Sequence, residues 1–270
     1  MASATSTAKD LRAVAARLRD LAEPDGGPLR VGVDLGTSSC VIVVLDGSGS
    51  PVWVDTRPTA AIRDGVVVDF FVARDAVQSL KSDAEAALGV ELTRAATAYP
   101  PGTGADAGPT CRFVLEAAGF DEVVLVDEVS AAQRALQLTD GVLVDVGGGS
   151  TGVGVFRAGD LVALDDRPGG GHHLDLVLAG GLGIELAAAE KRKRRQQRGD
   201  LGILRAGIER VAESIRSMTD GAEDLPVHLA GGALMIPGAA EIIAGRLDRK
   251  VVAYPHALFI TPLGIARTAP

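Results

Sequence analysis

The sequence contains one motif twice, and this repeat limits the folds that the chain can adopt. An alternation of apolar residues leads into Asp145, three glycines, Ser150 and Thr151, and a second alternation then continues to Phe156. The same pattern occurs 111 residues upstream. Five residues match without a gap: Val31, Val33, Asp34, Gly36 and Ser39 correspond to Val142, Val144, Asp145, Gly147 and Ser150. Because alternation interrupted by a glycine turn is typical of a β-hairpin, the repeat predicts two hairpins in two similar halves.

Each glycine-rich turn is a candidate phosphate site. Glycine has no Cβ to hold an anion away from the main chain, so successive N–H groups can form an anion-binding nest, to which serine and threonine hydroxyls add donors. The aspartate before each turn is the kind of ligand that holds Mg²⁺ through its water shell. One such turn is weak evidence, because most glycine turns only connect strands. The second copy favours a nucleoside phosphate held between two facing hairpins.

Composition excludes several classes of function. The 270 residues are 47% apolar, enough for one large core or two modest ones. A net charge of −8 argues against a general nucleic-acid or anionic-membrane binder, because such proteins need a basic face. The apolar runs are too short to cross a bilayer, and the amino terminus lacks the apolar segment of a signal peptide. Cys40 and Cys111 provide neither a disulfide framework nor zinc spacing, so we expect a cytoplasmic protein.

Residues 9–22 predict a short amphipathic helix with six apolar residues on one stripe. The breaker-rich stretch EPDGGP follows it and reads as a linker, which places the helix outside the first folded half. Two alternatives remain open. The helix docks on its own domain, or it is a detachable element that binds a partner protein.

The remaining pattern predicts an α/β fold. We expect antiparallel strands within 29–54, further strands at 62–69, 92–98 and 122–126, and helices at 72–88 and 109–118. The resulting βαβαβ order implies a parallel sheet. After the second hairpin we expect helices from about 174, over 201–218, from about 237 and from 261, with strands at 226–229 and 251–253.

Four further features bear on a candidate site. Glu128, directly after a strand, is either a base that orients water or only a negative charge at a helix N-terminus. The glycines at 169–171 precede a helix and predict another anion seat. His172 and His173 are adjacent and point in different directions, which argues against a metal site. The basic run AEKRKRRQQR predicts a solvated helix face, with ligand contact by one or two members as the alternative.

Five segments, in this order along 29–270, resemble the actin-like ATPase superfamily, which includes actin, the ATPase domains of heat-shock chaperones and the sugar kinases. They are DLGTSSC and DVGGGST as the two phosphate loops, DEVSAAQRA and TPLGIA as the connecting helices, and LAGGALMIPG as the adenosine turn. Within the superfamily, AATAYPPG, GGGHHLDLVLAG and LFITPLGIA are most similar to the EutJ family, chaperone-like proteins of bacterial ethanolamine-utilisation operons. The resemblance implies an actin-like ATPase fold of two duplicated ribonuclease-H-like halves around a nucleotide cleft.

The resemblance also implies a domain division and a set of site residues. An amphipathic helix and linker at 1–28 would precede a first half at 29–139, completed by 256–270, and a second half at 140–255. Asp34 and Asp145 would hold Mg²⁺ through water, and Glu128 would orient the attacking water. The phosphate donors would be Gly36, Thr37, Ser38, Gly147, Gly148, Gly149 and Ser150. The nucleoside contacts would be Gly231 and Gly232 for adenosine and Glu190 and Lys193 for ribose and adenine.

The implied function is an ATP-binding, chaperone-like ATPase that acts on a client enzyme or on a microcompartment protein. Heat-shock chaperones hold the terminal phosphate with a lysine, but Lys81 is the one lysine between the two loops and falls on a predicted core helix, so we expect slow Mg²⁺-dependent hydrolysis. Two alternatives remain. A small-molecule kinase of the same fold would need a base, for which only Asp64 and Asp69 are candidates, and a nucleotide-binding scaffold would form filaments.

Overall fold

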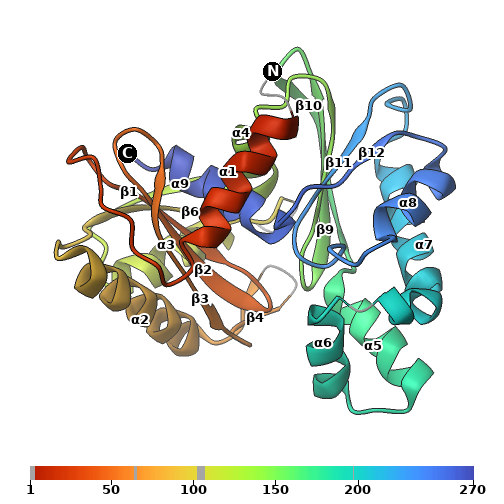
Figure 1. Cartoon of the computed structure of the whole chain (residues 1–270), viewed down its shortest axis with the longest axis horizontal. Coiled ribbons are helices and arrows are strands. Elements are labelled where there is room, and N and C mark those ends of the chain that lie inside the picture. Colours follow the sequence, from red (N-terminus) through yellow and green to blue (C-terminus); the bar gives the residue numbers. More distant parts are fainter. Residues whose placement is uncertain (1–3, 64–65, 102–106, 197) are drawn as a thin grey trace. The chain divides into compact units, whose positions relative to one another are not determined.

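The computed structural model describes residues 4–63, 66–101, 107–196 and 198–270 (Figure 1). Asp64, the first of the two candidate kinase bases, lies outside these residues. The chain divides into two compact units. The first comprises Met1–Gln137 with Phe259–Pro270, and the second comprises Leu138–Leu258.

The first unit is built on a five-stranded sheet in the order β3-β2-β1-β6-β7. Its strands are β1 (Arg30–Leu35), β2 (Ser39–Leu45), β3 (Pro51–Pro58), β6 (Arg94–Tyr99) and β7 (Glu122–Asp127). The first three are antiparallel neighbours, whereas β1, β6 and β7 run parallel, as the βαβαβ order predicts. Where one strand was expected over 62–69, the structure has a separate small hairpin of β4 (Ile62–Arg63) and β5 (Val66–Val67).

Helices cover both faces of this sheet. They are α2 (Phe70–Leu88) and α3 (Ala107–Ala117) on one face and α4 (Glu128–Leu136) and α9 (Ile260–Thr268) on the other. The Asp69 carboxylate accepts a hydrogen bond from Val72 N at the start of α2, and Gly89, at φ +69°, ends that helix at the residue predicted to stop it. The 3₁₀ turn η2 (Ala257–Phe259) leads directly into α9, and a second one, η1 (Arg198–Asp200), lies in the second unit.

The amino-terminal helix α1 (Ala4–Ala16), red in Figure 1, ends six residues earlier than predicted. It packs against β3 and α4, with Leu11 and Val14 fully buried. The chain then runs along the edge of β3, where Arg19 N donates to Val54 O at 2.8 Å and Ala22 N donates to Val52 O at 3.0 Å. The docked alternative therefore describes this structure, and the placement of the helix outside the first half was wrong.

The second unit repeats the strand arrangement of the first, in the order β10-β9-β8-β11-β12. Its strands are β8 (Gly141–Val146), β9 (Ser150–Arg157), β10 (Asp160–Pro168), β11 (Val227–Ala230) and β12 (Val251–Val252). The hairpin register is also repeated, because Asp34 pairs with Val41 and Asp145 pairs with Gly152, both 111 residues further on. The predicted duplication is thus confirmed down to the pairing of individual residues.

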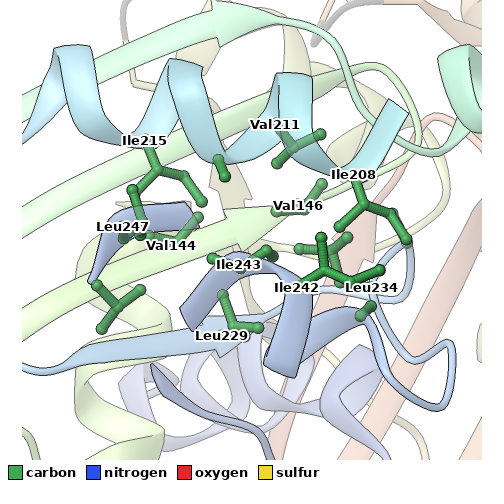
Figure 2. Packing of buried hydrophobic residues seen from close by; sticks show 14 of the residues in the cluster. Val144, Val146, Ile208, Val211, Ile215, Leu229, Leu234, Ile242, Ile243 and Leu247 are labelled. Atoms are coloured by element: carbon green, nitrogen blue, oxygen red, sulfur yellow. The ribbon is translucent and has the colours of Figure 1, made fainter. Parts of the chain in front are cut away.

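The helices of the second unit are α5 (Gly171–Leu182), α6 (Leu186–Arg194), α7 (Leu201–Met218) and α8 (Ala239–Leu247). Figure 2 shows the side of α7 that carries Ile208, Val211 and Ile215 packed towards Val144 and Val146 of β8. These α7 residues recur at intervals of three and four, so the helical period predicted from the sequence is confirmed.

Candidate functional site

The two glycine hairpins have the same turn. Gly36 N donates to Ser39 O at 3.2 Å in the first unit, and Gly147 N donates to Ser150 O at 3.1 Å in the second. Thr37 and Ser38 lie between the two bonded residues in the first turn, and Gly148 and Gly149 lie between them in the second. The phosphate donors predicted from the sequence therefore lie at equivalent positions of two equivalent turns.

A third glycine segment, residues 169–172, donates hydrogen bonds to the backbone carbonyls of the second hairpin. Gly171 N donates to Gly147 O at 2.9 Å, His172 N to Gly148 O at 2.8 Å, and Gly169 N to Gly149 O at 2.7 Å. By contrast, the N–H groups of Gly148 and Gly149 have no hydrogen-bond partner within the described parts of the chain. With its carbonyls occupied, this loop presents backbone donors, which is the arrangement that an anion requires.

These contacts correct one prediction. Residues 169–171 were expected to form an anion seat at the start of α5, but the N–H groups of Gly171 and His172 already donate to the hairpin carbonyls. The segment supports the second hairpin, and no spacing rule in the sequence indicated that role.

Asp145 and the predicted adenosine turn lie together. Asp145 is the last residue but one of β8 and is 8% exposed, and a Cβ on Gly231 would lie 2.4 Å from its Oδ1 and 2.3 Å from Val146 O. Gly231 has φ +80°, a conformation that favours glycine. Ala233 N also donates to Val146 O at 3.2 Å. The structure thus brings together two segments that the sequence analysis assigned to phosphate and to adenosine, and exposed Gly232 lies beside them.

On α6, the side chain of Lys193 is largely enclosed and binds other groups of the protein. Its Nζ forms an ion pair with Asp175 Oδ1 at 2.7 Å and donates to Gly171 O, and the two side chains are only 9% and 7% exposed. Burial is the main cause that lowers the pKa of Lys193 and raises the pKa of Asp175. Asp175 was not among the site residues predicted from the sequence. The one signal was a carboxylate between the apolar Leu174 and Leu178 on a helix otherwise short of acids.

Most of the basic run is solvated, as predicted, since Lys191, Arg194, Arg195 and Gln196 are exposed, and Lys193 is the exception. Besides Lys193, Arg192 pairs with Asp200 at 2.7 Å, and Arg194 pairs with Glu190 at 2.6 Å. Glu190, a predicted nucleoside contact, keeps a side chain that is 41% exposed. Its role and that of Lys193 as direct ribose or adenine contacts stay predictions.

In the first unit, Asp34 and Glu128 leave the same edge of the sheet. Asp34 is near the end of β1, Glu128 follows β7, and β6 lies between these strands, so the two backbones are roughly 10 Å apart. The cap of α4 comes from Asp127, whose Oδ1 accepts from Ser130 N at 2.8 Å. Capping therefore does not require the carboxylate of Glu128.

Cys40, Cys111 and Lys81 are buried in this unit. Burial, together with the charges of Glu128 and Asp34, raises the pKa of Cys111 to about 12, and burial with Asp34 does the same for Cys40. Both thiols stay protonated at neutral pH, so neither is a nucleophile. Lys81 is 8% exposed and donates to Glu85 Oε1 at 2.6 Å on α2, the core helix predicted for it.

The described residues lack a metal-binding cluster and a membrane-spanning helix, and they form one groove of note. No cluster of three or more His, Cys, Asp or Glu side chains there is arranged to hold a metal ion, and His172 and His173 are both exposed with rings 76° apart. No helix among them has the length and hydrophobicity needed to cross a membrane. A groove of about 840 Å³ between α7 and α8 is lined by Leu201, Pro237 and Ile242 and contains no predicted site residue.

The comparisons with known proteins decide the family. No protein-family model matches the chain. The ethanolamine utilization protein EutJ of Salmonella typhimurium is 37% identical over 243 residues, which are 89% of this chain and 86% of that protein. The chain belongs to the EutJ family. The crystal structure of EutJ from Carboxydothermus hydrogenoformans matches this EutJ-family chain with a TM-score of 0.91 and 38% identity, covering 98% of this chain and 99% of the other.

The fold is actin-like. MreB5 of Spiroplasma citri, in a crystal structure with bound ADP, matches with a TM-score of 0.72 at 14% identity, covering 89% of this chain and 95% of MreB5. At that identity the match shows the fold alone. Together with the repeated sheets, it confirms the predicted actin-like architecture of two duplicated halves.

Proposed function

We propose that this EutJ-family chain binds ATP with Mg²⁺ and acts as a nucleotide-dependent, chaperone-like switch on a partner enzyme or microcompartment protein of ethanolamine utilisation. The observation that carries the proposal is the second hairpin, whose carbonyls are occupied by residues 169–172 while the N–H groups of Gly148 and Gly149 are left as donors. Family membership supplies the metabolic context. The ADP-bound MreB5 shows that a protein with this fold can hold a nucleotide.

The residues present fit the proposed ligands. Backbone donors at both hairpins, with the hydroxyls of Thr37, Ser38 and Ser150, suit phosphate oxygens. Asp34 and Asp145, each just before its turn, suit a hydrated Mg²⁺, which would neutralise phosphate charge when bound. Gly231, Gly232 and Glu190 remain for the nucleoside, and Glu128 for the orientation of water.

The proposed turnover is slow. Lys81 is committed to Glu85 on a core helix, so it does not supply the terminal phosphate with the cation that heat-shock chaperones use. Phosphoryl transfer depends on charge neutralisation in the transition state, so the lack of one cation lowers the rate more than the affinity. The proposed switch is therefore driven by nucleotide binding and does not depend on rapid hydrolysis.

Thermal unfolding with and without nucleotide tests the proposal. ATP with Mg²⁺ should raise the Tm, because a ligand at a hundredfold excess over its Kd stabilises the folded state by about 2.7 kcal/mol. Asp145→Ala should abolish this shift without a large change in the Tm of the nucleotide-free protein. Asp160→Ala, at the exposed start of β10, is the matched control and should keep the shift.

A wild-type protein without any shift at millimolar ATP would contradict nucleotide binding. Light scattering for polymers and phosphoryl transfer to small acceptors test the filament and kinase alternatives in the same samples.

A further inference from the structure

Two hydrogen bonds connect α6 to the second glycine hairpin. Lys193 Nζ donates to Gly171 O, and Gly171 N donates to Gly147 O at 2.9 Å. The same Nζ is 2.7 Å from Asp175 Oδ1, one helical turn after Gly171 on α5. The lysine therefore joins α6 to the start of α5, and the start of α5 holds the hairpin carbonyls.

The lysine amine lies where these segments meet. A Cβ placed on Gly171 would lie 3.0 Å from Lys193 Nζ, 3.4 Å from Ala233 Cβ and 3.5 Å from Gly147 O. Ala233 in turn belongs to the turn that packs beside Asp145. A single buried ammonium group thus lies at the junction of the phosphate hairpin, its supporting glycines and the predicted adenosine turn.

A buried ion pair is poor evidence for stability, because the desolvation of both charges offsets most of their attraction. Its effect is to hold a geometry. An ammonium group that donates to the Gly171 carbonyl fixes the backbone at that residue, and the adjacent N–H groups of Gly171 and His172 then meet the hairpin carbonyls.

We propose that Lys193 is a positioning residue that acts through Asp175 and Gly171 to hold the second hairpin in its phosphate-binding form, in place of a direct contact to ribose or adenine. The proposal rests on the proposed function and deepens it. Glu190 is then the α6 side chain that remains on the nucleoside side.

Amide hydrogen exchange of the nucleotide-free protein is the first test. Lys193→Met should speed exchange about tenfold at the amides that join the two segments, because local opening frees them. These amides are Gly169, Gly171 and His172. Arg192→Met is the matched control. It breaks a second ion pair of α6, to the buried Asp200, without touching Gly171, and should leave these amides unchanged. Unchanged exchange in Lys193→Met would overturn the proposal.

Titration with Mg²⁺ and three probes, tripolyphosphate, ADP and adenosine, is the second test. Lys193→Met and Asp175→Asn should each weaken tripolyphosphate and ADP by about tenfold, because they misplace the same phosphate donors. Adenosine should bind nearly as before. The double variant should be no weaker than either single one, since both act through one network.

A different pattern would overturn the proposal. If Lys193→Met weakened adenosine and ADP equally while Asp175→Asn bound both normally, the lysine would contact the nucleoside itself. Asp175→Asn is nearly isosteric, so it also serves if Lys193→Met fails to fold. If the wild type binds none of the three probes, the proposed function fails, and the exchange rates alone decide whether Lys193 holds the hairpin.

Discussion

Asp127 and Glu128 are neighbours at the start of α4 with different surroundings. Asp127 caps the helix through Ser130 N, whereas Glu128, the first helical residue, is half-buried near Cys111 and at the same sheet edge as Asp34. Since Asp127 already caps the helix, α4 does not need the carboxylate of Glu128 for capping. This division favours a role for Glu128 in chemistry over a role as a helix-terminal charge.

Glu128→Gln tests that role. The amide keeps the shape of the side chain but removes the charge that would polarise a water, so nucleotide affinity should stay within about twofold while hydrolysis falls by about a hundredfold. Binding is followed by calorimetry and turnover by phosphate release. The matched control is Asp127→Asn, which changes the helix cap and should leave turnover nearly intact. An unchanged rate in Glu128→Gln would return this residue to the role of a terminal charge.

In the first unit, α9 packs closely against α4 and against β1, and a glycine lies at each of these two contacts. Gly264 on α9 crosses α4 so closely that an added Cβ would lie 1.7 Å from Ala131 O, and a Cβ on Gly32 of β1 would lie 2.3 Å from Ala266 N. Backbone cannot yield as a flexible side chain does. The absence of a side chain at these two positions therefore lets α9 pack against both the sheet and α4.

Gly264→Ala should for this reason destabilise the protein by about 3 kcal/mol or prevent folding, because the core is already filled at that crossing. Urea unfolding measures the change. Gly202→Ala on α7 is the control, since nothing lies within 4 Å of its added Cβ and its φ is not in the left-handed region. That control should stabilise by about 0.4–1 kcal/mol, as expected for alanine in a helix. Equal effects of the two substitutions would contradict the close crossing.

At the scale of the whole molecule, segments from both ends of the chain pack into the first unit. Residues from α1 and from α9 belong to the same unit, and Arg267 Nη2 pairs with Asp10 Oδ2 at 2.7 Å across 257 residues of sequence. Arg267 also donates to Ala135 O at the end of α4. The helix that the sequence presented as separable is thus part of the packing that surrounds α4.

Leu11→Ala tests how far the fold depends on α1. Leu11 is fully buried, so its truncation should cost about 2–4 kcal/mol and lower the Tm by several degrees. Leu21→Ala, at a side chain that is 42% exposed, is the control and should change stability by no more than about 0.5 kcal/mol. A Leu11→Ala variant as stable as the control would show that α1 detaches in solution, and would revive its role as a partner-binding element.

Local patterns by themselves determined much of this protein. The two hairpins, the core stripe of α7 and the end of α2 at Gly89 follow from alternation, helical period and turn chemistry, which are properties of neighbouring residues. They also indicated Asp34, Asp145 and the glycine turns as one kind of site.

Features that depend on contacts between residues far apart in the sequence were decided only by the tertiary structure. Strand β10 was not predicted, because its residues are almost all exposed and an edge strand that buries neither face has no alternation to detect. Likewise, the docking of α1, the support of the second hairpin by residues 169–172 and the Lys193–Asp175 pair all join segments whose spacing in the sequence says nothing about contact. A buried charge finds its partner only when the chain has folded around it, so the pairing of Lys193 with Asp175 became visible only in the tertiary structure.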